Sequence, residues 1–358
     1  MNKTDNLREG FTTGACAAAA AKAATILLCD EPLPETVDIP LRNGGRAAFA
    51  VNGAGVRADT AFASVVKDSG DDPDITNGAT VTAAVSWMTD GDIIFAAGEG
   101  VGTVTKKGLS IPPGEPAINP GPRTMIRAAV REVTGRPVHV ELSIPGGDLL
   151  AARTFNPRLG IVGGLSVLGT TGIVRPYSHP ALRESLKCTL DVALGGGLRR
   201  MVFTAGNIGT NVAMKSLGIM KDAVIEVSNE WGFMLDCLER HDIDALLVVG
   251  HPGKLAKLPA GEWDTHSSRS ASAIPYVRQT AREVMGADLE NANTVEEIIE
   301  NYTGAARTKL ASALAEKVAA AVAERTKGRF AVSVALVNMK GEVTGAYGDL
   351  GGWTKKNL

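Results

Sequence analysis

Residues 201–250 have the sequence MVFTAGNIGTNVAMKSLGIMKDAVIEVSNEWGFMLDCLERHDIDALLVVG, and this stretch decides the fold. Three short apolar runs predict strands, and two segments of helical character lie between them. In chain order the predicted elements are Met201–Ala205, Thr210–Leu217, Ala223–Val227, Trp231–Arg240 and Ala245–Val249. Because strands alternate with helices at this spacing, we expect the C-terminal half to be a Rossmann-like, parallel-sheet α/β domain.

Segments further along the chain extend this domain. A helix is predicted to begin near Ser178 and to end at the three glycines that start at Gly195. Further helices are predicted at Ser270–Met285 and Thr308–Thr326, and a last strand at Phe330–Val337, paired with residues near Gly345–Tyr347.

The N-terminal half has a different character, because strands predominate and few crossover helices can be placed between them. Asn43–Gly45 is a turn signal between two short apolar runs. Strands are also predicted at Ala79–Trp87, Asp92–Ala97 and Val138–Ile144, and helices after Thr12 and Thr13 and at Pro122–Val133. We therefore expect two domains: an α+β domain at residues 1–172 and the α/β domain at residues 173–358.

Composition excludes several classes of protein. Lys and Arg total 37 and Asp and Glu total 39, so no basic excess is available to bind a nucleic acid. The four cysteines and five histidines are scattered, which indicates neither a disulfide framework nor a protein metal site. The run Ala15–Leu28 is mostly alanine, unlike a signal peptide or a membrane span. We expect a cytoplasmic enzyme that acts on a small molecule without membrane or nucleic-acid partners, and homo-oligomerisation is left open.

Glycine-containing loops follow two of the predicted parallel strands, and ligands of open parallel sheets bind outside the carboxyl ends of the strands. Glu226 lies twenty positions after Gly206, the spacing at which a carboxylate accepts hydrogen bonds from ribose hydroxyls in dinucleotide-binding folds. The full G-x-G-x-x-G pattern is absent, so a nucleoside without pyrophosphate contacts suits the loop better; a tight turn with a capping glutamate is the alternative. The predicted cofactor-binding residues are Gly206, Asn207, Gly209, Glu226, Asn229, Gly250 and His251.

Two loops of the N-terminal half are candidates for anion binding. Gly98–Gly108 contains Lys106 and Lys107, and its backbone N–H groups could help to hold an anion; a hairpin with a solvated lysine pair is the alternative. The proline-rich segment that follows is stiff and places Arg123 on the first turn of the next helix, which suits a ligand carboxylate. The alternative for this segment is a rigid connector with an exposed arginine.

The segment 8–22, REGFTTGACAAAAAK, resembles the start of the cobalt-precorrin-5B C1-methyltransferases of the anaerobic cobalamin pathway. Further resembling stretches follow in consistent order: Gly98–Gly108, Pro113–Arg123, Thr154–Arg158, Gly169–Tyr177, Phe203–Gly209 and Gly250–Lys254. The resemblance implies methyl transfer from S-adenosylmethionine to C1 of a cobalt-bound corrin, giving cobalt-precorrin-6A. The cobalt would come with the substrate, so no protein metal is implied.

A corrin substrate carries several carboxylates, and the predicted substrate-binding residues are Thr12, Thr13, Lys106, Asn119, Arg123 and Arg158. The alanine-rich helix could let a flat macrocycle lie close to its backbone. No residue is identified as catalytic. Two alternatives are a dinucleotide-dependent oxidoreductase, which the missing G-x-G-x-x-G disfavours, and a non-catalytic tetrapyrrole carrier, which would need no nucleoside pocket.

Overall fold

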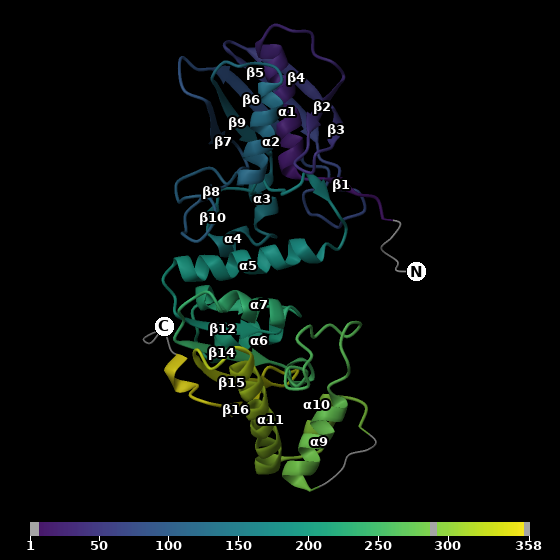
Figure 1. Cartoon of the computed structure of the whole chain (residues 1–358), viewed down its shortest axis with the longest axis vertical. Helices are drawn as coiled ribbons and strands as arrows, with labels where there is room; N and C mark the ends of the chain where they lie inside the picture. The colour runs from purple at the N-terminus through teal and green to yellow at the C-terminus, as the bar shows by residue number, and fades with distance from the viewer. Residues whose placement is uncertain (1–6, 287–291, 354–358) are drawn as a thin grey trace. The chain divides into compact units, whose positions relative to one another are not determined.

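The computed structural model describes residues 7–286 and 292–353. The chain divides into two compact units, Met1–Pro180 and Ala181–Leu358, each of which is described by itself (Figure 1). This division falls shortly after the boundary expected at residue 172. The fold is mixed α/β: the N-terminal unit contains a mixed sheet and the C-terminal unit a mainly parallel one.

The main sheet of the N-terminal unit has five strands in the order β4-β5-β6-β9-β7. The strands are β4 (Gly53–Arg57), β5 (Thr60–Val66), β6 (Thr80–Trp87), β9 (Val138–Ser143) and β7 (Ile93–Ala97). Neighbours are antiparallel except β7 and β9, which are parallel. Strands β6, β7 and β9 are confirmed predictions. Strands β4 and β5 were not predicted, because glycine and alanine weaken the strand signal of their sequences.

A second, two-stranded sheet confirms the predicted turn at Asn43–Gly45. Strands β2 (Thr36–Pro40) and β3 (Arg46–Ala50) pair as an antiparallel hairpin around it. The turn is closed by Leu41, whose backbone N–H donates to the carbonyl of Gly45 at 2.8 Å.

Helix α1 (Thr13–Leu28) forms the buried centre of this unit. Its alanines between Ala15 and Ala24 have no solvent-exposed surface, and the helix packs against α2 (Pro120–Arg131) and strands β5 and β6 (Figure 1). The small alanine side chains allow these neighbours to approach the α1 backbone closely. The expectation that a flat ligand could lie against this helix is therefore wrong, because protein atoms already surround its alanines.

One charged cluster ties together three elements of the N-terminal unit. Glu132, at the end of α2, binds Lys22 Nζ of α1 at 2.6 Å and accepts two hydrogen bonds from Arg46 of β3, at 2.7 and 2.9 Å. The hydrogen bonds from Arg46 are the main cause that lowers the pKa of Glu132 from 4.5 to about 2.

This pKa predicts how the stability of the unit depends on pH. The folded-state pKa of Glu132 is depressed, so its contribution is present above pH 4.5 and is lost as pH falls toward 2. We expect Glu132→Gln to lower the free energy of unfolding most above pH 4.5, with the difference from wild type shrinking toward pH 2. Denaturant unfolding across this range measures the effect. Glu35→Gln, at an exposed carboxylate, is the control and should show no such convergence.

The main sheet of the C-terminal unit has the order β13-β12-β14-β15-β16. The strands are β13 (Val224–Glu226), β12 (Arg200–Thr204), β14 (Ala245–Gly250), β15 (Ala331–Val337) and β16 (Val343–Tyr347). The first four are parallel, which confirms the prediction, and β16 is antiparallel to β15. The chain passes from β12 to β13 on one side and then to β14 on the other. The carboxyl ends of β12 and β14 therefore flank a topological switch point.

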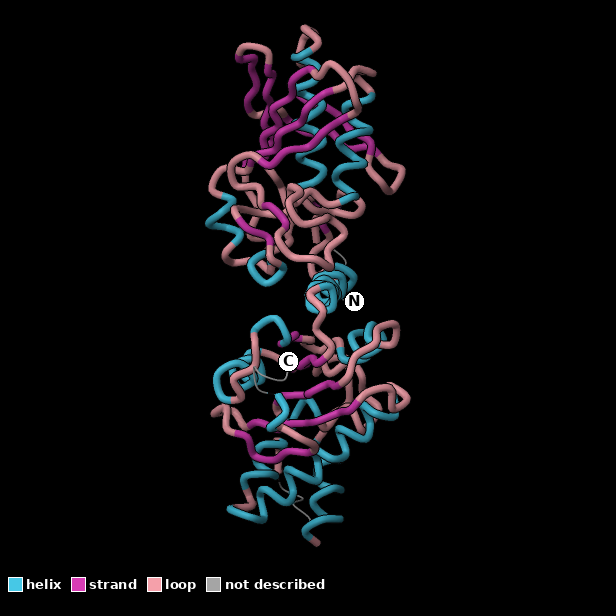
Figure 2. The backbone as a smooth tube through the Cα atoms, turned by 90° about the vertical axis from the view of Figure 1, so that its left-hand side faces the viewer, coloured by secondary structure: helices cyan, strands magenta, loops and turns pink. Residues whose placement is uncertain are grey.

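Alternate residues of the central strands enter two separate cores, so both faces of this sheet are buried. One core contains Phe203 and Val248; the other contains Val202 and Leu247. The first core is closed by helices α5 (His179–Gly195), α7 (Trp231–Leu238), α9 (Ile274–Met285), α10 (Val295–Glu300) and α11 (Gly304–Arg325). The second is closed by residues of the π-helix η1 (Val212–Ser216) and by Trp353. Figure 2 shows helices on both sides of these strands.

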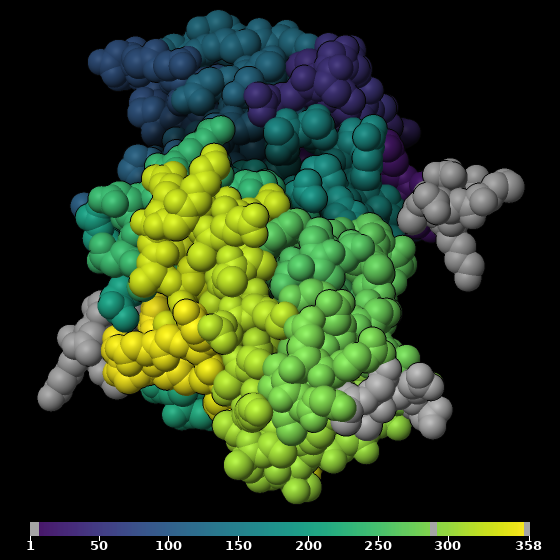
Figure 3. Space-filling model, turned by 60° about the horizontal axis from the view of Figure 1, so that its bottom comes forward, coloured from purple at the N-terminus to yellow at the C-terminus, as the bar shows by residue number. Residues whose placement is uncertain are grey.

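Most helices of this unit agree with the predictions. The predicted helices near Ser178, at 270–285 and at 308–326 are confirmed as α5, α9 and α11. Helices α9, α10 and α11 contact one another, and Figure 3 shows α11, in yellow-green, beside the green surface of α9 and α10. Within residues 7–286 and 292–353, no helix has both the length and the apolar character that crossing a bilayer requires.

Candidate functional site

The end of β12 is the centre of the predicted cofactor site. Gly206 follows this strand with φ 150° and ψ −172°, a conformation that is essentially restricted to glycine. A Cβ added at Gly206 would have no neighbour within 4 Å, so the backbone faces open space here. Asn207 is exposed and begins the short helix α6 (Asn207–Asn211) at the same edge of the sheet. A ligand can therefore approach this turn closely.

Two other glycines of the predicted site are explained by packing. A Cβ at Gly209 would lie 2.6 Å from the carbonyl oxygen of Val249, so α6 could not rest on β14. A Cβ at Gly250 would lie 2.9 Å from that of Ala205, which would force the ends of β12 and β14 apart. These glycines shape the edge, and their direct contact with a ligand stays a prediction.

Charged groups converge at the same edge. Glu226 ends β13 and is paired in register with Thr204 of β12. Lys254 donates from Nζ to the carbonyl oxygen of Ala205 at 3.1 Å. Burial lowers the pKa of Lys254, and the negative charge of Glu226 partly opposes that shift. The structure thus brings a half-exposed carboxylate, an ammonium group and the open glycine turn to one end of the sheet.

Asn229 is held between two loops of this unit. Its side-chain oxygen accepts a hydrogen bond from Thr265 Oγ1 at 3.2 Å, and its backbone carbonyl accepts from the Thr265 N–H at 3.0 Å. Asn229 therefore fixes the segment after β13, and contact with a cofactor stays a prediction.

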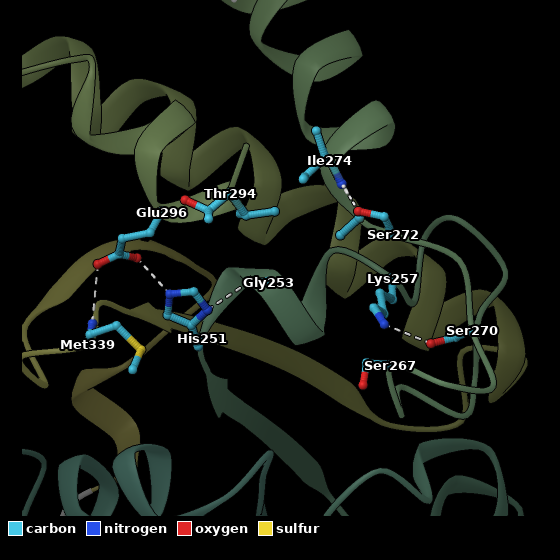
Figure 4. A pocket seen from close by; sticks show the side chains of 12 residues that line it. His251, Gly253, Lys257, Ser267, Ser270, Ser272, Ile274, Thr294, Glu296 and Met339 are labelled. Carbon is cyan, nitrogen blue, oxygen red and sulfur yellow. Dashed lines mark hydrogen bonds and ion pairs between the residues drawn. The ribbon is translucent and has the colours of Figure 1, made fainter. Parts of the chain in front are cut away.

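His251 uses both ring nitrogens within the protein (Figure 4). Nδ1 accepts a hydrogen bond from the Gly253 N–H at 3.0 Å, which caps helix α8 (Pro252–Leu255). Because Nδ1 is the acceptor, the proton of the neutral ring is on Nε2, which donates to Glu296 Oε2 at 2.6 Å. No ring lone pair is left to remove a proton from a substrate. His251 is thus a structural link between β14 and α10, and the geometry does not favour it as a general base.

A pocket of about 440 Å³ opens beside His251 and extends toward α9 (Figure 4). It is lined by His251, Gly253, Lys257, Ser267, Ser270, Ser272, Ala273, Ile274, Thr294, Val295, Glu296 and Met339. Lys257 and Glu296 line this pocket and were not among the residues predicted from the sequence. The serine-rich run at residues 265–272 is the sequence signal that could have pointed to this pocket.

The two threonines of the opening segment stabilise the fold around α1. Thr12 Oγ1 accepts a hydrogen bond from the Ala15 N–H at 3.2 Å and caps the helix. Thr13 Oγ1 exchanges two hydrogen bonds with the backbone of Leu168, at 3.0 and 3.2 Å. Both threonines are buried, so the segment that carries the resemblance binds a glycine-rich loop of its own unit.

Three other candidates lie near these loops. Strand β8 (Thr103–Val104), within the loop of Lys106, pairs with β10 (Ile161–Val162), and the stem of Lys106 packs against Gly160. Thr103 also forms an antiparallel bridge with Pro116, and Val104 exchanges backbone hydrogen bonds with Gly114 and Glu115, so the lysine loop has the form of the hairpin alternative as well as a pairing with a distant segment. Arg158 lies half-buried in α4 (Asn156–Leu159), and Asn119 is the half-buried N-cap residue of α2. The role of these residues in substrate binding stays a prediction.

Arg123 is engaged by its own chain. Its Nε donates to the carbonyl of Ile118 at 2.8 Å, and its Nη2 binds Glu115 Oε2 at 3.1 Å. The guanidinium also lies over the ring of Phe95, 5.5 Å from the centroid. These contacts stiffen the proline-rich segment and give Arg123 a structural role.

We therefore expect Arg123→Ala to lower the free energy of unfolding by about 1–3 kcal/mol, because hydrogen bonds of a charged group are lost. Arg158→Ala is the matched control, since within the described ranges the Arg158 guanidinium forms no ion pair or hydrogen bond. This variant should change the free energy of unfolding by less than about 0.5 kcal/mol. Denaturant unfolding measures both. A stable Arg123→Ala protein with weakened substrate binding would instead support the carboxylate clamp.

The predicted residues fall into two separate groups. The structure places the cofactor candidates in the unit Ala181–Leu358 and the substrate candidates in the unit Met1–Pro180. Within the C-terminal unit, Gly206, Glu226 and Gly250 meet at one sheet edge, because each ends or follows a parallel strand.

Comparison with known proteins identifies the family. Residues 1–176 match the family model CbiD, and residues 264–348 match the model described as CbiD, C-terminal domain. A curated protein of Syntrophotalea carbinolica is 50% identical over 347 residues, which cover 97% of this chain and 99% of that protein. The chain belongs to the CbiD family. The resemblance seen in the sequence is thereby confirmed.

The CbiD relatives carry consistent names. The protein of S. carbinolica is named cobalt-precorrin-5B C(1)-methyltransferase. The same name is given to a protein of Methanocaldococcus jannaschii, 41% identical over 97% of both chains, and to one of Desulfitobacterium hafniense, 41% identical over 94% of this chain and 89% of that protein. A solved structure of a cobalamin biosynthesis protein (cbiD) from Archaeoglobus fulgidus aligns with a TM-score of 0.40 and 31% identity, covering 74% of this chain and 83% of that chain.

Proposed function

We propose that this chain transfers a methyl group from S-adenosylmethionine to C1 of cobalt-precorrin-5B in cobalamin biosynthesis, giving cobalt-precorrin-6A. One observation carries the proposal: over 97% of its length, this chain is 50% identical to a relative named for this C1 methylation. The alignment covers 97% of this chain and 99% of that relative, so the activity is carried over for both units and not for one of them.

The carboxyl edge of the C-terminal sheet, with its Rossmann-like arrangement, is the proposed donor site. The adenosine ribose would hydrogen-bond to Glu226, which ends β13 beside β12. The open space at Gly206 would let the nucleoside approach the backbone, and the exposed Asn207 amide lies at the same turn. The absence of a G-x-G-x-x-G pattern fits a nucleoside ligand that carries no pyrophosphate.

S-adenosylmethionine supplies a methyl group on a positively charged sulfur, and transfer is an in-line displacement. Such a reaction depends mainly on positioning, so residues that orient the two reactants supply much of the rate. A carboxylate such as Glu226 would add favourable electrostatics beside a sulfonium ligand. His251 contributes by fixing the loop after β14, since both of its nitrogens are already hydrogen-bonded.

The corrin substrate brings its own cobalt and several carboxylates. Lys106 and Arg158 remain the cationic candidates for those carboxylates in the N-terminal unit, with Asn119 as a further hydrogen-bonding group. Arg123, Thr12 and Thr13 would act indirectly, because their polar atoms hold the loops that carry the other candidates.

An anaerobic assay with S-adenosylmethionine labelled in its methyl group and with cobalt-precorrin-5B tests this proposal. We expect the label to appear in the corrin product, with S-adenosylhomocysteine formed in equal amount. Substrate binding without label transfer would favour a tetrapyrrole carrier. A fluorescence change of NAD(P)H on binding, together with no label transfer, would favour an oxidoreductase.

A further inference from the structure

Lys257 is an unusually buried cation in the C-terminal unit. Lys257 is 7% exposed. Its Nζ donates to the carbonyl of Thr265 at 3.2 Å and to Ser270 Oγ at 2.7 Å. Ser270 in turn donates its hydroxyl proton to the carbonyl of His266 at 2.8 Å. Both partners of the ammonium group are therefore neutral oxygens.

The charge of Lys257 has no carboxylate partner among the residues that the structure describes. Three acids near Lys257 have other partners: Glu262 accepts from the Ala271 N–H, Asp264 binds Arg269, and Glu296 accepts from His251 and from the Met339 N–H. The other deeply buried lysine, Lys67 in the N-terminal unit, is paired with Asp74 at 2.7 Å. Burial of a charge is costly unless it is paired, so the contrast indicates that Lys257 awaits a counter-charge from a ligand.

The cavity beside Lys257 offers suitable space and further donors. Lys257 and the hydroxyl residues Ser267, Ser270, Ser272 and Thr294 line the same pocket of about 440 Å³ (Figure 4). Ser272 Oγ accepts a hydrogen bond from the Ile274 N–H, and Thr294 Oγ1 accepts from the Glu297 N–H. The hydroxyl oxygens of Ser272 and Thr294 are thus used as acceptors. Their hydroxyl protons are available to donate to a ligand oxygen.

We propose that this pocket is a carboxylate-binding subsite in which Lys257 provides the counter-charge and the Ser272 hydroxyl a hydrogen bond. The inference rests on the proposed function, since both reactants carry carboxylates: the methionine part of S-adenosylmethionine and the side chains of the corrin. His251 lines the pocket and follows Gly250 directly, so the pocket adjoins the proposed donor edge. A buried ammonium gives stronger attraction than an exposed one, because water screens it less.

Lys257→Met tests the subsite, with two nucleoside ligands as probes. S-adenosylhomocysteine carries the amino-acid carboxylate, whereas 5′-methylthioadenosine lacks it. If the subsite holds the donor, calorimetry should show S-adenosylhomocysteine binding weakened by about tenfold or more, with methylthioadenosine binding unchanged. If it holds the corrin, both nucleosides should bind normally and the KM for cobalt-precorrin-5B should rise by about tenfold or more, with little change in kcat.

Controls separate a binding effect from a folding effect. Lys257→Met breaks no ion pair but loses two buried hydrogen bonds, so its thermal unfolding midpoint is measured first and ligand binding is compared at a temperature where the variant is fully folded. Lys309→Met, which removes an exposed cation of α11, should leave both affinities and the KM unchanged. Ser272→Ala is the second variant, used if Lys257→Met is unstable. It should weaken binding of the same ligand by a smaller factor.

The subsite would be overturned if folded Lys257→Met and Ser272→Ala both kept the nucleoside affinities and the KM of wild type. Methyl transfer by the wild-type protein would still support the proposed function in that case. Failure of wild-type protein to bind S-adenosylhomocysteine or to transfer methyl would overturn the proposed function, and this subsite with it.

Discussion

Glu226→Ala should weaken binding of S-adenosylhomocysteine by about 10- to 100-fold, because hydrogen bonds to a charged acceptor contribute about 1.5–3 kcal/mol. Glu226 ends an edge strand and is half-exposed, and within the described residues it enters no ion pair. Removing its carboxylate should therefore leave the fold intact. Calorimetric titration of the purified variant measures the change in affinity.

Glu316→Ala is the control for this variant, since Glu316 is an exposed carboxylate on α11. It should bind S-adenosylhomocysteine as wild type does. Wild-type affinity in a folded Glu226→Ala protein would remove the ribose assignment and would move the search for the nucleoside to another part of the chain.

Gly100→Ala should destabilise the N-terminal unit by about 4 kcal/mol or more, a loss typical of severe core disruption. Gly100 has φ +70°, and a Cβ there would lie 1.9 Å from the carbonyl oxygen of Ile144. The carbonyl of Gly100 also accepts a hydrogen bond from Leu165 at 2.8 Å, so the backbone cannot simply move away. Denaturant unfolding, followed by far-UV circular dichroism, measures the loss.

Gly114→Ala is a matched control from the neighbouring proline-rich segment. Gly114 also has a positive φ, +91°, but a Cβ there would meet no atom within 4 Å. Its cost should be limited to the backbone conformation, about 1–2 kcal/mol. Equal losses in the two variants would contradict the account, because they would show that the close approach of Gly100 to Ile144 has no energetic consequence.

Much of the fold follows from local patterns in the sequence. The strands and helices of residues 201–250 were predictable because strand–helix alternation permits few topologies, and a parallel sheet also places the strand ends at one edge. The environment of α1 was not predictable from its composition. Alanine explains why residues 15–24 are helical, but only the positions of α2, β5 and β6 show that the helix is buried.

The candidate cofactor site could likewise be predicted only where it depends on local sequence patterns. Gly206, Glu226 and Gly250 could be grouped because each ends or closely follows a parallel strand of one sheet. The pairing of His251 with Glu296, 45 residues later, depends on how α10 packs and leaves no local sequence signal. The roles of Thr12, Thr13 and Arg123 could not be told from their residue types, because the same donors that bind a ligand carboxylate also bind backbone carbonyls.

Hydrogen exchange of the protein with and without S-adenosylhomocysteine tests the central claim most directly, namely that the carboxyl edge of the C-terminal sheet holds the methyl donor. Ligand binding slows exchange of the backbone amides that it orders or covers. The account predicts slower exchange in peptides that contain Gly206–Asn211 and Gly250–Ala256, the segments that follow β12 and end β14. Slower exchange confined to peptides of the N-terminal unit, with no change in these two segments, would contradict it.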